Sequence, residues 1–221
     1  MIWKIIFYFF KIIDPESSHS FIIMCLRFGF YPRLKTFSMK TKVNGLFFKN
    51  PIGLAAGFDK NALIIRPISN MGFGFTEIGT ITPKSQLGNK KPRIFRLIND
   101  QAIINRNGFN NDGMEVIKKR LIKYRKSYHL NSEFKLGINI GANKETNSKI
   151  DDYQILVSEL SSYADYISIN ISSPNTPGLK ALQSKGQLLS LLKSVNQGIS
   201  NNKKKKLNIP LFIKISPDIS N

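Results

Sequence analysis

ISINISSPNTPG, residues 167–178, combines the two features that the rest of the chain repeats. It begins with β-branched residues separated by small ones, a pattern typical of a strand buried on both faces. From Ser172 onward the residues are small, polar or turn-forming, and Pro174 and Pro177 prevent both helix formation and pairing in a sheet. The stretch therefore predicts a buried strand that ends in a rigid polar loop.

The end of this strand concentrates hydroxyl and amide side chains: Asn170, Ser172, Ser173 and Asn175 lie within six positions. An amide offers a donor and an acceptor in one fork, which suits the edge of a pyrimidine, a ureide or a flavin ring. For any single residue the alternative is a turn that only caps the strand. The whole group favours a binding site.

Outward from this stretch, apolar strands alternate with helices. Strands are predicted in 73–80, 135–141, 167–171 and 211–216, and 50–60 is predicted to be a strand followed by a loop; helices are predicted over 62–71, 111–125, 150–163 and 181–199. This alternation predicts an α/β fold, a parallel sheet covered by helices. A glycine-rich phosphate turn does not follow the first strand, which argues against a Rossmann sheet.

Polar residues recur at or just beyond the carboxyl ends of these strands, where a (β/α)8 TIM barrel builds its active site. They are Lys60, Thr80, Asn139, Asn170, Ser173 and Lys214. A complete barrel takes about 250 residues, so residues 41–221 are expected to form an incomplete one of about five of the eight βα units.

Two of these residues lie inside apolar strands. Asn139 in KLGINIG needs a hydrogen-bond partner, which a ligand could supply. Lys214 in LFIKIS is costly to bury unless it is paired. We therefore expect both residues to belong to a functional site and not only to the packed core.

The N-terminal 40 residues differ from the rest. MIWKIIFYFFKII, residues 1–13, predicts a helix with one polar stripe, too short to span a bilayer but suited to its interface. Asp14, Pro15 and Glu16 predict the start of a second helix, over 15–28. The helical pair is either a core hairpin or a membrane-docking segment, so we expect two units, 1–40 and 41–221.

The composition limits the classes of function. The chain has 221 residues, a formal net charge of +19 and one cysteine, Cys25, so it forms no internal disulfide. The charge is mostly lysine spread over loops and helix surfaces, and the run at 203–206 is typical of a solvated connector. We therefore expect no nucleic-acid partner, although a basic surface favours an anionic membrane.

Three segments together resemble one enzyme family. NISSPNTPGL at 170–179, GLAAGFDKN at 53–61 and DPESSH at 14–19 resemble the quinone-dependent, membrane-associated class of the dihydroorotate dehydrogenases. The soluble relatives use a cysteine as base, and Cys25 lies far from the loop in sequence, which favours the quinone class.

This resemblance implies an oxidoreductase, a flavoprotein that oxidises dihydroorotate to orotate with FMN and passes the electrons to a membrane quinone in pyrimidine biosynthesis. Ser173 matches the catalytic base. The implied substrate-binding residues are Lys60, Asn105, Arg106, Asn107, Gly108, Phe109, Asn170 and Asn175. The implied FMN-binding residues are Ala56, Gly57, Lys60, Thr80, Asn139, Asn170 and Lys214. The implied quinone-site residues are His19 and Arg96, and no metal is implied.

The resemblance also implies a location and a length. The N-terminal helices would place the protein peripherally on a membrane, on the cytoplasmic side of a bacterial-type inner membrane or an equivalent. Members of the family continue well past the position of residue 221, so a truncated or split enzyme is expected. Asn107 departs from the family, which usually has a hydrophobic residue there.

Two alternatives remain. An incomplete barrel leaves sheet edges open, so the chain could be an inactive fragment that acts at most as an interaction partner. A flavin-dependent tRNA dihydrouridine synthase would explain the charge, but it needs a cysteine acid in the active-site loops, where this sequence has none.

Overall fold

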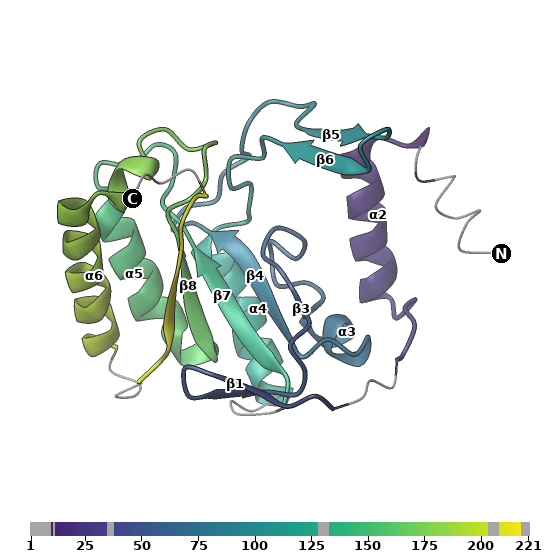
Figure 1. Ribbon diagram of the computed structural model, residues 1–221, viewed down its shortest axis with the longest axis horizontal. Helices are drawn as coiled ribbons and strands as arrows, with labels where there is room; N and C mark the ends of the chain where they lie inside the picture. The colour runs from purple at the N-terminus through teal and green to yellow at the C-terminus, as the bar shows by residue number, and fades with distance from the viewer. Residues whose placement is uncertain (1–9, 11, 35–37, 128–132, 203–207, 218–221) are drawn as a thin grey trace.

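The centre of the computed structural model, which describes residues 10, 12–34, 38–127, 133–202 and 208–217, is a parallel sheet of five strands (Figure 1). The strands are β3 (Gly53–Leu54), β4 (Phe75–Ile81), β7 (Lys135–Ile140), β8 (Tyr166–Asn170) and β9 (Leu211–Lys214). Their order in the sheet is their order in the sequence, as in a (β/α) barrel and unlike the reversed order of a Rossmann sheet. The predicted α/β fold is confirmed.

Helices cover one face of this sheet. Figure 1 shows α4 (Met114–Ser127) behind the strands and α5 (Lys149–Leu160) beside β8, with α6 (Lys185–Ser200) next to α5. The short α3 (Ile65–Asn70) follows β3 in the sequence. Every residue of β7 and β8 is buried. This burial explains why both strands consist mostly of apolar and small residues, with Lys135, Asn139 and Asn170 as the exceptions.

One predicted helix is divided in the structure. The expected continuous helix over 181–199 is a 3-10 turn, η2 (Lys180–Gln183), followed by α6. Ser184 between them is extended, with φ −65° and ψ 146°, so the continuous helix was wrong. A second 3-10 turn, η1 (Ser161–Tyr163), extends α5 as far as predicted.

Two antiparallel hairpins flank the sheet at opposite ends. The hairpin of β1 (Thr41–Val43) and β2 (Leu46–Phe48) crosses the end where the strands begin. Its turn residues Asn44 and Gly45 both have positive φ, as a type I′ turn requires. The hairpin of β5 (Ile94–Leu97) and β6 (Ala102–Asn105) lies at the other end, beside α2 (Figure 1).

Helix α2 (Pro15–Arg27) begins as the sequence predicts, since the Asp14 carboxylate accepts the Ser17 N–H at 2.8 Å. Its Ile23 and Leu26 pack in the same hydrophobic cluster as the sheet and its helices. The helix expected over 1–13 falls almost entirely outside the described residues. Among the residues described, no helix is both long and apolar enough to cross a bilayer.

Candidate active site

A cavity of about 480 Å³ lies at the carboxyl ends of the strands. It gathers side chains that are up to 158 positions apart in the sequence, because these strand ends meet at one edge of the sheet. The residues predicted from the sequence that line it are Ala56, Gly57, Lys60, Thr80, Asn105, Asn107, Gly108, Phe109, Asn170, Ser173, Asn175 and Lys214.

One wall of the cavity is made of backbone. The loop after β3 is fixed to the end of β4, since the Gly57 N–H donates to the Gly79 carbonyl at 2.8 Å and the Gly79 N–H donates to the Asp59 carbonyl at 3.1 Å. Gly57 has φ +105°, and no atom lies within 4 Å of where its Cβ would stand. The wall therefore leaves open space in which a flat ring could approach the main chain.

Asp59 stabilises the same loop from within the protein interior, since its side chain is buried and the residue is 1% exposed. Its carboxylate accepts the N–H groups of Leu63 and Ile64 at 2.8 and 2.9 Å. Burial raises the pKa of Asp59, and these hydrogen bonds oppose that effect. Asp59 thus anchors the loop that carries Lys60.

Three side chains from three strands form a buried polar network behind the cavity. Thr80 Oγ1 donates to Asn139 Oδ1 at 2.7 Å, and Asn170 Nδ2 donates to Thr80 Oγ1 at 3.1 Å. Asn139 is fully buried and does not line the cavity. The hydrogen-bond partners of Asn139 in the structure are protein groups, and through them it supports Thr80 and Asn170.

The loop after β8 is polar, as predicted, and is held by side-chain hydrogen bonds. Asn170 Oδ1 accepts the Ser172 N–H at 3.3 Å and the Ser172 hydroxyl at 3.1 Å. Ser173 Oγ accepts the Asn175 N–H at 3.3 Å. That bond orients the half-buried Ser173 hydroxyl at the cavity wall and leaves its O–H available.

The amide-rich segment over 105–111 forms a further wall. Asn111 holds it to the end of β4, since its Nδ2 donates to Thr82 Oγ1 at 2.8 Å. Asn107 Nδ2 donates to Asn105 Oδ1 at 3.2 Å. Among the described residues, Asn107 Oδ1 and Asn110 Oδ1 are buried without a hydrogen-bond partner. Unpaired buried acceptors beside a cavity indicate a site built for a polar ligand.

Two predicted side chains are placed differently from expectation. Arg106 does not line the cavity: its guanidinium donates to the Pro92 carbonyl at 2.9 Å and lies over the Phe95 ring. Lys214 was expected to be buried, but it is exposed because β9 pairs only with β8 in the described sheet. Lys214 nevertheless lines the cavity.

A second cavity, of about 860 Å³, lies between α2 and the β5–β6 hairpin. Both residues assigned to the quinone, His19 and Arg96, line it beside apolar side chains such as Ile22 and Leu97. The two cavities share the lining residues Gly57, Lys60, Asn105 and Asn107. Arg96 also donates to the Ile13 carbonyl at 2.7 Å, which ties the hairpin to the start of α2.

Burial affects the pKa values of two of these lining residues, Lys60 and His19. Burial lowers the pKa of Lys60, and burial followed by the positive charge of Lys60 lowers the pKa of His19. His19 Nε2 lies 2.8 Å from the Phe58 carbonyl oxygen. Because a carbonyl only accepts, Nε2 carries the proton and Nδ1 of the neutral ring is an acceptor.

The sequence reasoning missed several supporting residues: Asp59, Glu77, Asn111 and Asn143. Asn143 Nδ2 donates to Gln86 Oε1 at 2.8 Å, and its Oδ1 accepts the Lys84 N–H at 2.9 Å. Glu77 had a detectable signal, because a charged residue inside an apolar strand demands a partner as Asn139 does. The asparagines are in loops, where amides are common and give no such signal.

The fold and the site together define an α/β protein of the barrel type, with its ligand cavity at the carboxyl ends of the strands. Comparison with known families gives a match between residues 38–221 and the family described as dihydroorotate dehydrogenase. The chain belongs to the dihydroorotate dehydrogenase family.

Individual relatives agree. The chain is 49% identical over 211 residues to a protein of Bartonella tribocorum named dihydroorotate dehydrogenase (quinone), covering 94% of this chain and 57% of that protein. It is 44% identical to a protein of the same name from Erythrobacter litoralis, covering 94% and 58%. A crystal structure of Eimeria tenella DHODH in complex with ferulenol has a TM-score of 0.86 and 40% identity, covering 94% of this chain and 60% of that one. The chain thus spans less than two thirds of the length of these relatives.

Proposed function

We propose that the protein oxidises dihydroorotate to orotate with FMN and passes the electrons to a quinone, as a step of pyrimidine biosynthesis. The observation that carries the proposal is the cavity of about 480 Å³, which brings Ser173 together with Lys60 and the amides of Asn105 and Asn175. The family membership of residues 38–221 supports it.

The residues present fit a flavin. Ala56 and the open face of Gly57 offer space for a flat ring, while Thr80 and Asn170 offer polar groups at the end of the sheet. Lys214 provides a positive charge at the cavity, which would stabilise the negative charge of the reduced flavin. Bound FMN would supply the two-electron oxidising chemistry that no side chain can provide.

The substrate would be held by amides and a cation. The forks of Asn105 and Asn175 can pair with the alternating N–H and C=O groups of a pyrimidine ring, and Lys60 can pair with its carboxylate. Buried acceptors on Asn107 and Asn110 would gain donors when the ring N–H groups arrive.

Ser173 would remove the proton from C5 of dihydroorotate. A serine is a weak base at its ordinary pKa and needs help from its surroundings. The Asn175 N–H at 3.3 Å from Ser173 Oγ favours the oxygen when it has lost its proton. The polar loop over 172–178 would also limit the access of water.

Quinone would enter through the second cavity, past His19 and Arg96, and a membrane surface would supply it. Phe21 and Met24 of α2 and Phe28, which directly follows it, are 49%, 46% and 75% exposed. The net charge of +19 would favour anionic lipid. Peripheral association with the cytoplasmic side of an inner membrane, and a unit boundary near residue 40, belong to the same proposal.

The test is a flavin spectrum. The protein is purified with and without lipid, and its visible absorbance is recorded before and after dihydroorotate is added without air. Bound flavin that bleaches with dihydroorotate and recovers with a short-chain quinone is the expected result. A colourless protein, or a flavin that dihydroorotate does not bleach, would favour the inactive interaction partner instead.

A further inference from the structure

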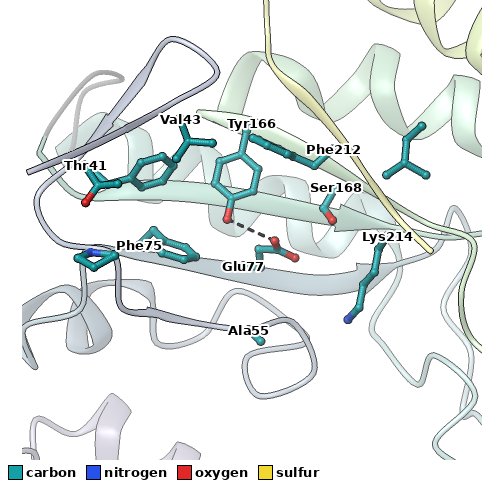
Figure 2. A pocket seen from close by; sticks show the side chains of 12 residues that line it. Thr41, Val43, Ala55, Phe75, Glu77, Tyr166, Ser168, Phe212 and Lys214 are labelled. Carbon is teal, nitrogen blue, oxygen red and sulfur yellow. Dashed lines mark hydrogen bonds between the residues drawn. The ribbon is translucent and has the colours of Figure 1, made fainter. Parts of the chain in front are cut away.

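Glu77 lies in the middle of β4, on the sheet face opposite the covering helices. Its side chain points into a cavity of about 520 Å³ that is lined by Phe75, Tyr166 and Phe212 (Figure 2). This cavity adjoins the site cavity, because Lys214 lines both. A carboxylate among apolar and aromatic side chains needs hydrogen-bond donors to offset the loss of water. The proposed reaction assigns Glu77 no role.

The two oxygens of Glu77 each accept one hydrogen bond. Asn139 Nδ2 donates to Oε2 at 3.1 Å, and the Tyr166 hydroxyl donates to Oε1 at 3.4 Å (Figure 2). Burial, followed by the negative charge of Glu77, raises the pKa of Tyr166, so the phenol keeps the proton that it donates. A carboxylate offers only acceptors, so Asn139 must turn its NH₂ group toward Glu77.

This choice fixes the next two side chains. With its NH₂ group toward Glu77, Asn139 presents Oδ1 to Thr80 at 2.7 Å and to Asn170 Nδ2 at 3.3 Å. Asn170 must then present its own Oδ1 to Ser172, whose N–H and hydroxyl both donate to it. The orientation set at Glu77 therefore reaches the loop that carries Ser173 through a series of defined donors and acceptors.

We propose that Glu77 is a positioning residue of the reaction: its carboxylate fixes the amide orientation of Asn139, and through Asn170 it fixes the polar loop that carries Ser173. This inference rests on the proposed function. A glutamine at position 77 can donate as well as accept, so it permits Asn139 and Asn170 to turn over and leaves the loop without its acceptor.

The first experiment compares Glu77→Gln with Tyr166→Phe in the purified holoprotein. Glu77→Gln is expected to slow flavin reduction by saturating dihydroorotate about tenfold or more and to shift the visible spectrum of bound FMN. Tyr166→Phe removes the other donor to the same carboxylate and is expected to stay within about threefold of the parent rate. Equal rates and spectra for Glu77→Gln and the parent would overturn the inference.

The second experiment tests the orientation without flavin chemistry. Asn139→Asp places two carboxylates together, and it is expected to lower the thermal unfolding midpoint of the FMN-free protein. Adding Glu77→Gln to Asn139→Asp lets the new amide donate to the new carboxylate, whose other oxygen still faces Thr80 and Asn170. The double variant is expected to unfold at a midpoint close to that of the parent. If the losses in midpoint of the two single variants simply added in the double variant, the pairing of residues 77 and 139 would be contradicted.

The two experiments separate the inference from the proposed function. If the parent protein shows no reduction by dihydroorotate, the proposed function fails, and the positioning role fails with it even where the midpoints of the FMN-free variants are non-additive. If the parent is active and Glu77→Gln matches it, only the positioning role fails.

Discussion

At the scale of single residues, Ser173 is the side chain on which the proposed chemistry depends. Its Oγ accepts the Asn175 N–H, and its O–H lies at the wall of the site cavity. We expect Ser173→Ala to slow flavin reduction by dihydroorotate by about 10²–10⁴-fold, the usual contribution of a general base, with FMN binding retained. Rapid-mixing absorbance measures the rate.

The matched control is Ser172→Ala, which removes the neighbouring hydroxyl of the same loop. The Ser172 N–H still donates to Asn170 Oδ1 in this variant, so a loss of less than about tenfold is expected. A Ser173→Ala variant that reduces flavin at the rate of Ser172→Ala would remove Ser173 from the role of base.

The residues also show what the sequence could and could not predict. Asn139 was identified because a buried amide in an apolar strand must be paired, but the sequence could not say that the partners are Thr80, Glu77 and Asn170. Lys214 was misjudged because burial depends on the number of neighbouring strands, which local pattern does not encode. The direction of Arg106, toward the hairpin, is likewise a tertiary property.

At the scale of elements, a buried ion pair between Arg93, just before β5, and Glu16 helps to hold α2 to the β5–β6 hairpin. Arg93 Nε donates to Glu16 Oε2 at 3.1 Å, and the Arg93 and Glu16 side chains are 6% and 16% exposed. Lys91 adds a weaker contact at 3.4 Å. The hydrogen bond from Arg93 is the main reason that the pKa of Glu16 lies below its ordinary value of 4.5.

The lowered pKa of Glu16 makes the stability of the fold depend on pH in one direction. A carboxyl whose pKa is lower in the folded state stabilises the fold above pH 4.5, and the contribution is lost as the pH falls below that value. We expect Glu16→Gln to lower the free energy of unfolding at pH 7 by about 2 kcal/mol, and to lower it less at pH 3.5. Denaturant unfolding at both pH values measures the change, with the exposed Glu115→Gln on α4 as control. A loss of equal size at both pH values would contradict the ion pair.

The exposed face of α2 supports a second prediction at this scale. Met24 and Phe28 are 46% and 75% exposed, so Met24→Ser with Phe28→Ser removes apolar surface without emptying the core. We expect the double variant to bind anionic vesicles about tenfold more weakly in sedimentation. Ile155→Ser removes an exposed apolar side chain from α5 and is expected to bind as the parent does. Equal binding by all three proteins would argue against docking through α2.

Element prediction succeeded where the signal is local. The start of α2 follows from Asp14 and Pro15 alone, since a cap is formed by neighbours in sequence. The break at Ser184 could not be predicted from neighbouring residues, because the Gln183 side chain at the end of η2 donates to the Ile171 carbonyl and accepts the Ser216 N–H from 33 positions away.

At the scale of the whole molecule, the order of the strands was predictable because alternating strands and helices with right-handed connections leave few arrangements. The same topology placed the strand ends together and therefore most of the candidate site. The cavity between α2 and the β5–β6 hairpin was not predictable, since it forms only where these two elements meet. His19 and Arg96, which line it, were assigned to a quinone only through the resemblance.

The two cavities predict that the two half-reactions can be separated by mutation. Of these two cavities, His19 lines the one between α2 and the β5–β6 hairpin but not the other, and Asn175 lines the one at the strand ends but not the other. We expect His19→Ala to slow reoxidation of the flavin by a short-chain quinone about tenfold while its reduction by dihydroorotate stays within twofold. Asn175→Ala is expected to give the opposite result. Rapid mixing measures each half-reaction in turn, and Lys60→Met, which alters a residue common to both cavities, is expected to slow both. If His19→Ala slowed reduction and reoxidation equally, the second cavity would be part of the substrate site and not a separate route for electrons.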